Sequence, residues 1–264
     1  MKTLLFSLVL SQSLMAQSQP FASFVELPWR YVIGGSESGK WLKSEAAGKK
    51  LNGKQTEYRL FTLGGEVGKV YGSKAAPDVD VCPDIWIQNI TPQPDLEVPA
   101  IGVNAMWDPQ PRKPQVLDNK QEVYVTAVGE LLKAEGLSNT KVEITRIVRV
   151  DLEGDGQMEV ILSGTHFVHK DELMMAEPGD YSFVAIRRIV DKKVRTQVLN
   201  GEFYPKREPD AAPSIHEISG VLDLNGDGVL EVLVNTAYYE GGGLKVWEMK
   251  KGEAVVAIEL DCGV

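Results

Sequence analysis

Two nine-residue stretches, at 151–159 and 223–231, share a spacing of oxygen-bearing side chains and glycines that suits a bound cation. They read Asp-Leu-Glu-Gly-Asp-Gly-Gln-Met-Glu and Asp-Leu-Asn-Gly-Asp-Gly-Val-Leu-Glu. In both, an oxygen-bearing side chain stands at positions 1, 3, 5 and 9, and glycine stands at positions 4 and 6. A tight turn of this kind can aim several oxygens at one point, as a hard cation such as Ca²⁺ requires. The spacing indicates metal binding and, because it occurs twice, a repeat.

Both stretches lie between apolar, β-like runs, and this separates them from the helix-flanked EF-hand. An EF-hand loop continues to a bidentate glutamate at position 12. That position is Leu162 in the first copy and Val234 in the second. We therefore expect strands on either side of each loop. The alternative to a metal loop is an acidic β-turn, because Asp, Asn and Gly favour turns without any ion.

The pattern Asp-x-Asx-Gly-Asp-Gly-x-x-Glu between two strands resembles the FG-GAP/VCBS repeat, the calcium-loop blade of integrin α-subunit propellers and of many bacterial surface proteins. The second copy fits this pattern, whereas the first carries Glu153 where Asp or Asn is usual. The resemblance implies two structural Ca²⁺ sites, with the residue at position 7 contributing its backbone carbonyl. The ligands that it implies are Asp151, Glu153, Asp155, Gln157 and Glu159 for one ion, and Asp223, Asn225, Asp227, Val229 and Glu231 for the other.

The C-terminal half, residues 142–264, reads as two repeats of four antiparallel strands, each with the acidic loop between its first two strands. Aligning the copies gives seven identities in the ten positions from 151 to 160. Four antiparallel strands are the make-up of a propeller blade, so we expect an all-β fold, as a β-propeller or a partial propeller. The expected strands are 143–150, 160–163, 181–190 and 195–204 in the first repeat, and 215–222, 232–237, 244–249 and 254–260 in the second.

The N-terminal region, residues 19–117, is also β-rich but contains no such loop. Short apolar runs between glycines predict strands at 30–33, 58–62, 69–71 and 85–87. The polar, lysine-rich stretch 39–55 is expected to be an exposed hairpin or loop. Residues 118–141 form a connector with one inserted helix over 119–135, because its apolar residues recur at helical spacing and Gly136 follows as a cap.

The first 18 residues have the features of a signal peptide. Lys2 gives a positive start, residues 4–10 are apolar, and small residues at Ala16 and Ser18 offer a cleavage point. We therefore expect an exported protein, periplasmic or extracellular. No later stretch approaches the ~20 apolar residues of a membrane span. Losing Lys2 with the leader takes the formal net charge from −9 to −10, which argues against nucleic acid or an anionic membrane as partner.

The chain has two cysteines, Cys82 and Cys262. In an oxidising compartment such a pair predicts one disulfide, joining the N-terminal half to the C-terminus. The alternative is two unpaired thiols.

Three other groups of residues could do chemistry, and each has a plainer interpretation. His166 and His169 form a His-x-x-His pair of the kind found in zinc sites, or lie in a polar loop. His216 and Glu217 could act as an acid–base pair, or lie at a strand edge. Residues 238–243, Tyr-Tyr-Glu-Gly-Gly-Gly, could form an aromatic surface that binds a sugar or peptide, or a hairpin whose aromatic rings cover a sheet.

Taken together, the sequence favours an exported calcium-binding protein that acts as a non-enzymatic binding or adhesion module for a glycan or a protein ligand. A secreted or periplasmic polysaccharide hydrolase with structural calcium is the main alternative. A structural component of an exported complex is a third. The sequence contains no Gly-x-Ser-x-Gly or His-Glu-x-x-His motif, and its many carboxylates single out no glycosidase pair.

Overall fold

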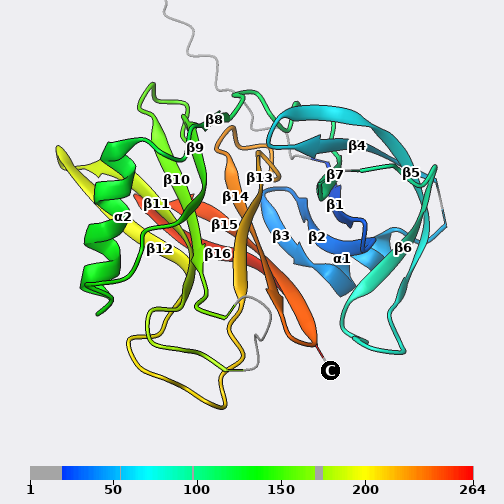
Figure 1. Ribbon diagram of the computed structural model, residues 1–264. Helices are drawn as coiled ribbons and strands as arrows, with labels where there is room; N and C mark the ends of the chain where they lie inside the picture. The colour runs from blue at the N-terminus through cyan, green and yellow to red at the C-terminus, as the bar shows by residue number, and fades with distance from the viewer. Residues whose placement is uncertain (1–19, 54, 97, 170–174, 264) are drawn as a thin grey trace, which may run out of the picture.

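The computed structural model describes residues 20–53, 55–96, 98–169 and 175–263. These residues form a mainly β molecule with three antiparallel sheets and two short helices (Figure 1). The expected signal peptide lies outside the described residues. Neither described helix is long and apolar enough to cross a membrane.

The N-terminal region folds into a small closed barrel. The strands pair in the order β1-β7-β4-β5-β6-β2, and β2 also pairs with β1, so that the ring closes. Closure leaves no free edges between these six strands. A short strand, β3, pairs with residues 34–37 of β2. The barrel strands are β1 (Ala22–Leu27), β2 (Tyr31–Glu37), β4 (Thr56–Thr62), β5 (Gly65–Pro77), β6 (Trp86–Thr91) and β7 (Ala100–Asn104), with β3 at Lys40–Lys43.

Alternation along β1 explains how the barrel has both an inner core and an outer packing face. Val25 and Leu27 belong to the cluster inside the barrel. Phe24 lies in a different cluster, shared with the C-terminal half. Because successive side chains of a strand point to opposite faces, Glu26 points outward with Phe24. The barrel therefore offers an apolar outer face on which another layer can pack.

The prediction of a loop or hairpin over 39–55 is wrong for residues 44–50, where helix α1 (Ser44–Lys50) forms. The helix packs on the barrel through Ala47 and Gly48, which are buried although lysines follow them in the sequence. A Cβ at Gly48 would lie 2.5 Å from the Trp86 ring, so only glycine allows this approach. The contact was missed because small residues carry it and the stretch has no apolar stripe.

The C-terminal half contains all eight strands that the repeats predict. They form two antiparallel meanders, β9-β10-β11-β12 and β13-β14-β15-β16, and β8 (Gln115–Leu117) adds to the first beside β9. The strands are β9 (Ile144–Val150), β10 (Glu159–His166), β11 (Tyr181–Val190), β12 (Lys193–Phe203), β13 (Ile215–Leu222), β14 (Glu231–Tyr238), β15 (Gly241–Lys250) and β16 (Glu253–Gly263).

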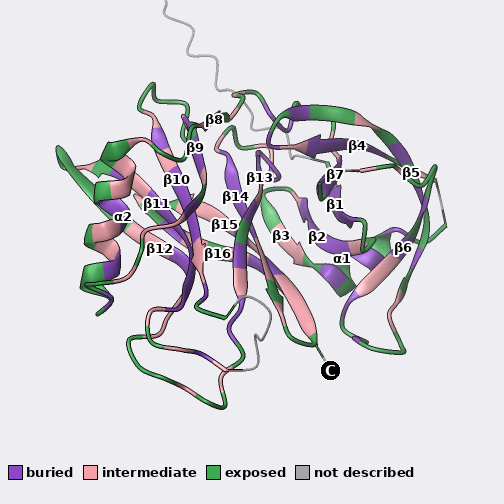
Figure 2. Ribbon diagram, viewed as in Figure 1, coloured by how far each residue is buried: buried purple, intermediate pink, exposed green. Residues whose placement is uncertain are grey.

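The elements stack in layers (Figures 1 and 2). The expected inserted helix forms as α2 (Glu122–Ala134), which packs through Val128 and Leu132 on the outer face of the five-stranded sheet. The other face of this sheet packs on the four-stranded sheet, with Val150 and Val184 in one cluster with Val232. The four-stranded sheet in turn packs on the outside of the barrel.

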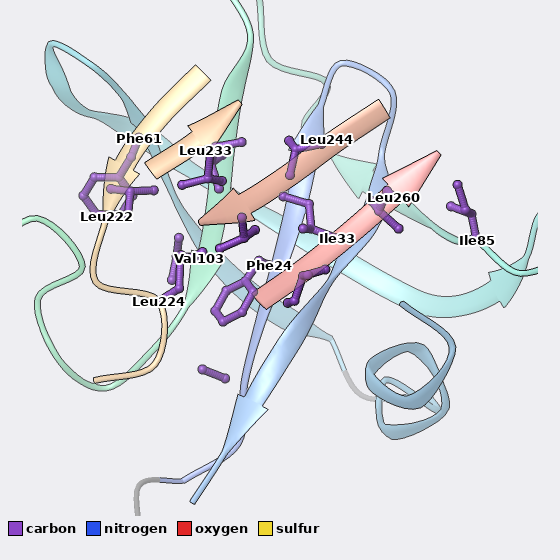
Figure 3. Packing of buried hydrophobic residues seen from close by; sticks show 14 of the residues in the cluster. Phe24, Ile33, Phe61, Ile85, Val103, Leu222, Leu224, Leu233, Leu244 and Leu260 are labelled. Atoms are coloured by element: carbon purple, nitrogen blue, oxygen red, sulfur yellow. The ribbon is translucent and has the colours of Figure 1, made fainter. Parts of the chain in front are cut away.

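The core between the four-stranded sheet and the barrel is large and apolar (Figure 3). Phe24 and Ile33 come from the barrel, whereas Leu233, Leu244 and Leu260 come from the sheet. No propeller is identified in the part of the chain that the structure describes. The two meanders pack face to face, but the barrel covers one outer face of the pair and α2 covers the other.

The predicted disulfide is confirmed, since Cys82 and Cys262 are bonded across a sequence separation of 180 residues. Cys82 lies in the connection between β5 and β6 of the barrel, and Cys262 lies on β16. The bond therefore ties the barrel to the last strand of the chain. A disulfide of this kind indicates an oxidising compartment, in agreement with part of the expected localisation.

Candidate functional site

The two acidic loops join the first two strands of each meander and have matching hydrogen bonds. In the first, Asp151 accepts the backbone N–H of the glycine at position 4 (2.7 Å) and of the glycine at position 6 (3.0 Å). Asp223 does the same in the second loop, at 2.7 and 3.0 Å. The four glycines have φ between 73° and 87°, a region that side chains disfavour. Each loop is thus wound around the carboxylate at position 1.

The glutamate at position 9 closes each loop. Glu159 accepts the backbone N–H of Leu152 at 2.8 Å, and Glu231 accepts that of Leu224 at 2.7 Å. Both leucines, at position 2, are fully buried in the hydrophobic clusters. Each loop is therefore anchored in the core by its second residue and fastened by its last.

The side chains at positions 3 and 5 differ between the loops. In the second loop, Asn225 donates to the Asp227 carboxylate at 3.0 Å, so these two expected ligands touch. In the first, Glu153 is exposed, and Asp155 accepts hydrogen bonds from the backbone N–H and from the side-chain amide of Gln157. Among the described residues, no three His, Cys, Asp or Glu side chains are gathered as a metal-binding group.

Burial makes three of the loop carboxylates costly to ionise. It raises the pKa of Glu231 well above its usual range and raises that of Asp223 and Glu159, with backbone hydrogen bonds acting in the opposite direction. None of the ion pairs among the described residues involves a carboxylate of either loop. The donor set, carboxylate and amide oxygens, is the chemistry that a hard cation prefers. The residues thus fit Ca²⁺ in kind, and Asp227 and Asn225 would have to exchange their mutual hydrogen bond for it.

The two loops lie against each other, which the sequence did not indicate. The backbone N–H of Leu230 donates to the carbonyl of Leu152 at 2.9 Å. Arg112 spans both loops: its guanidinium donates to the carbonyls of Asp151 (2.6 Å), Leu152 (2.9 Å) and Gly228 (2.5 Å). A Cβ at Gly154 would lie 3.2 Å from this guanidinium. The loops and Arg112 form one unit, which we call the paired-loop site.

Arg112 lies within the Pro-rich stretch 108–114, which carries no motif that marks a site in the sequence. In the structure the residues before Arg112 lie beside the second loop and are hydrogen-bonded to it. The Trp107 indole donates to the Asp223 carbonyl at 2.9 Å, and the Asp223 N–H donates to the Pro109 carbonyl at 2.7 Å. The sequence shows that an arginine bridges two loops only if the loops are already known to lie next to each other.

Replacing Arg112 by alanine is expected to lower the free energy of unfolding by about 2 kcal/mol, because charge-assisted hydrogen bonds to partly buried carbonyls are lost. Arg112→Lys should recover only part of the loss, since an ammonium cannot span three carbonyls on two loops. Urea denaturation of both variants measures the effect. An alanine variant with an unchanged midpoint would show that the guanidinium does not bind the loops together.

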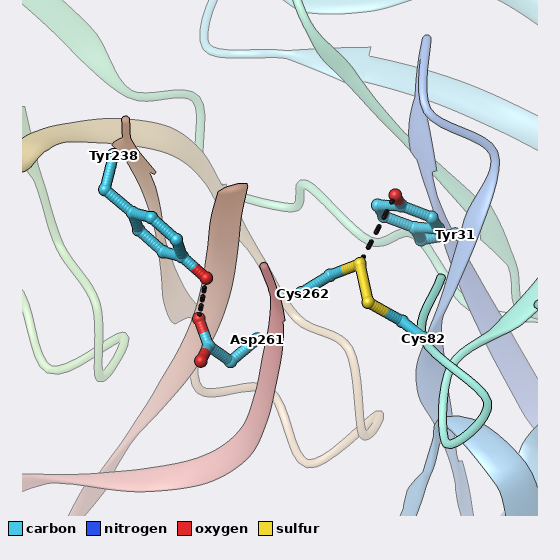
Figure 4. Close-up of a disulfide and its surroundings, with 5 residues drawn as sticks. All are labelled: Tyr31, Cys82, Tyr238, Asp261 and Cys262. Atoms are coloured by element: carbon cyan, nitrogen blue, oxygen red, sulfur yellow. Dashed lines mark hydrogen bonds between the residues drawn. A yellow bond between two sulfur atoms is a disulfide. The ribbon is translucent and has the colours of Figure 1, made fainter. Parts of the chain in front are cut away.

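A second feature is a cavity of about 370 Å³ between the barrel and the open end of the four-stranded sheet. Trp29 and Tyr31 line it from the barrel side, and Tyr238 and Tyr239 line it from the turn between β14 and β15. The Cys82–Cys262 disulfide lies between Tyr31 and Tyr238 (Figure 4). The volume is in the range of small-molecule sites. Residues 238–243, one of the candidate surfaces in the sequence, therefore line a cavity.

None of the candidate histidines is among the residues that line this cavity, although His216 contacts Thr236, which does line it. The His166 ring lies 3.4 Å from the Glu143 carboxylate and against the Tyr181 ring, while His169 is exposed. The acidic residues that follow this pair in the sequence, Asp171 and Glu172, lie outside the described residues. His216 is buried and contacts the Thr236 hydroxyl at 3.0 Å.

Comparison of the chain with protein-family models, with curated proteins and with solved structures finds no match. The paired-loop site and the cavity therefore carry the functional argument alone.

Proposed function

We propose that the protein is an exported, calcium-stabilised β-protein that acts as a non-enzymatic binding module. In this proposal each acidic loop holds one structural Ca²⁺, and the cavity beside the disulfide is the ligand site. The FG-GAP/VCBS-like character of the two meanders is part of the proposal. Its ligand is expected to be a glycan or a protein at a surface.

The observation that carries the calcium proposal is the matching geometry of the two loops. Nine-residue loops with different residues at positions 3, 7 and 8 wind in the same way around the carboxylate at position 1 and are closed by the glutamate at position 9. Buried carboxylates in these loops are supported by N–H groups and not by a side-chain cation within the described residues. A bound divalent ion would remove their mutual repulsion and their burial cost, so that binding energy becomes folding energy.

The contacts of Arg112 are compatible with this role. Its three acceptors are the carbonyls at positions 1 and 2 of the first loop and position 6 of the second. The carbonyls at position 7, on Gln157 and Val229, are the ones that the resemblance assigns to the metal. Arg112 and an ion would therefore use different oxygens of the same loops.

Thermal melting with calcium and with chelator tests the calcium sites. At a free Ca²⁺ concentration about tenfold above Kd, one site contributes about 1.4 kcal/mol, and two sites should raise Tm by roughly 5 °C. Asp227→Ala is expected to remove about half of this gain, because it leaves the first loop intact. Asp210→Ala, at an exposed aspartate away from both loops, is the matched control and should keep the full gain.

Equal melting curves with calcium and with chelator would contradict the two metal sites and would show that the loops are acidic β-turns without an ion. A hydrolase panel separates the binding module from its main rival. Turnover of a polysaccharide would support a hydrolase with structural calcium, whereas co-purification with a partner and no ligand binding would support a structural component.

A further inference from the structure

The wall of the cavity between the barrel and the four-stranded sheet is acidic. Its described lining includes two glutamates, Glu26 and Glu240, and none of its lining residues is Lys, Arg or His. The chain as a whole has a formal net charge of −9, so the surrounding field has the same sign. Such a site attracts cations and repels anions before any contact forms.

Glu26 is the buried polar group of the cavity. It is 4 % exposed, and the Asn235 side-chain amide donates to its Oε1 at 3.1 Å. β1 directs Glu26 away from the barrel interior, as it does Phe24, and β14 brings Asn235 to it from the opposite layer. Burying a carboxyl group without a counter-charge is unfavourable. A ligand that brought a positive charge to this position would supply one.

Aromatic side chains form the walls, and two of them are held in place by consecutive residues of β16. The Tyr238 hydroxyl donates to Asp261 at 2.8 Å, and the Tyr31 hydroxyl lies 3.9 Å from the Cys262 sulfur (Figure 4). A Cβ at Gly241 would come within 2.4 Å of the Tyr238 ring, so the ring lies directly on the glycine backbone. Rings that are fixed in this way lose little entropy when a ligand arrives.

Trp29 and Tyr239 stand at the cavity with 62 % and 60 % of their surface exposed. Large exposed aromatic side chains beside a cavity are typical of ligand sites rather than of a solvated surface. The faces of Trp and Tyr rings attract an organic cation through their quadrupole. Carboxylate and aromatic faces therefore favour the same class of ligand.

We propose that this cavity binds a small organic cation carrying an ammonium or quaternary ammonium group, with Glu26 and Glu240 supplying charge and the Trp29, Tyr31 and Tyr238 rings enclosing it. The proposal deepens the binding role proposed above and shares with it only the cavity, because it does not require either loop to hold calcium. Neutral sugars would use the rings without the carboxylates. They are the alternative that the experiment separates.

The probe is choline, compared with its uncharged carbon analogue dimethylbutanol, which has nearly the same shape. Titration is followed by calorimetry and by the change in tryptophan fluorescence, to which the exposed Trp29 contributes together with the four other tryptophans. Choline is expected to bind at least about tenfold more tightly than dimethylbutanol, because the analogue lacks the charge that the rings and carboxylates recognise. Glucose serves as the neutral sugar probe.

Glu26→Gln keeps the shape and the hydrogen-bond acceptor for Asn235 and removes the charge. At about pH 8, where Glu26 is ionised, this variant should weaken choline binding about tenfold and leave the binding of dimethylbutanol unchanged. Glu66→Gln, at an exposed residue on the barrel strand β5, is the control and should bind choline as the unchanged protein does. Circular dichroism of each variant shows that it is folded before titration.

Equal affinity for choline and its analogue, or full choline affinity in Glu26→Gln, would overturn the proposal. Tighter binding of glucose than of choline would do so too and would assign the cavity to a neutral sugar. Running the titrations with and without chelator, below the melting temperature, separates this proposal from the calcium sites. Choline binding that persists in chelator would support the cavity even if calcium leaves the melt unchanged.

Discussion

Removing the disulfide by the double substitution Cys82→Ala and Cys262→Ala is expected to lower the free energy of unfolding by about 4 kcal/mol. The bond closes a loop of 180 residues, for which the chain-entropy model gives about 5 kcal/mol as an upper value. Both cysteines are buried at the edge of the core between barrel and sheet. The loss acts mainly on the unfolded chain, which gains freedom when its two distant parts are no longer joined.

Guanidinium denaturation of the oxidised protein, the reduced protein and the double variant measures the effect. The double variant is used so that no free thiol remains. A thiol reductant should shift the midpoint of the unchanged protein toward that of the variant and leave the variant where it is. Equal midpoints for the oxidised protein and the variant would show that packing between the barrel and the sheet, not the covalent bond, sets the stability.

Replacing Glu26 by glutamine is expected to stabilise the protein at neutral to alkaline pH. Burial raises the pKa of Glu26 from the usual 4.5 to about 7, so that the folded protein keeps a proton that the unfolded chain has lost. The unfolded chain then holds fewer protons between these two values, and stability falls as the pH rises through this range. The contribution is fully present below 4.5 and is lost above about 7.

The size of this effect follows from the difference in pKa. A rise from 4.5 to about 7 corresponds to about 3 kcal/mol lost between acid and alkaline pH. Glu26→Gln carries no such cost, so its advantage should be near zero at about pH 4 and on the order of 3 kcal/mol at about pH 8. Urea denaturation across this pH range measures both proteins side by side.

Other titratable groups lie near Glu26, and the comparison of the two proteins cancels those that do not interact with it. Burial, helped by the Glu26 charge, raises the pKa of Tyr31 above its already alkaline value, outside the pH range compared. Tyr31 on β2 and Tyr238, Tyr239 and Glu240 on the β14–β15 connection line the same cavity. The buried loop carboxylates titrate in both proteins alike. Only the difference between the two pH profiles belongs to Glu26. A difference that does not change with pH would show that folding leaves the pKa of this carboxyl group unchanged.

These two predictions concern the same region of the molecule, where the barrel meets the four-stranded sheet. The disulfide holds the two layers together at one end of their shared core. Glu26 of the barrel and Asn235 of the sheet are hydrogen-bonded to each other between the same two layers. If the cavity binds a cation, the ligand restores at this point the charge balance that burial has disturbed. Binding would then stabilise the protein most at the pH where Glu26 is ionised.

Strands were predictable from the sequence where a repeated local pattern specified them. All eight strands of the two meanders and helix α2 follow from apolar periodicity and from the paired glycine turns. Helix α1 did not, because Ala47 and Gly48 make its contact and small residues leave no periodic signal. The expectation of a propeller went beyond the local pattern. Which layer covers each outer face of the two meanders depends on contacts between residues far apart in the sequence, and here the barrel covers one face and α2 covers the other.

The closed barrel could not have been predicted from its short strands. Its order, β1-β7-β4-β5-β6-β2, pairs the first strand with the last and with the second. Local sequence sets which residues alternate, but it does not set which distant strand each one meets. The barrel order was decided by the burial of two apolar faces of β1 and β2, one inside the barrel and one against the C-terminal sheet.

Local sequence was enough to specify two acidic loops with glycine at fixed places, the strands around them and one pair of cysteines. These are local properties, set by side-chain type, backbone freedom and spacing of a few residues. Tertiary structure alone decided that the loops lie together under Arg112 and that Glu26 and Asn235 face each other in an aromatic cavity. Such contacts join residues from 39 to 209 positions apart, and only the packing of complete layers brings them together.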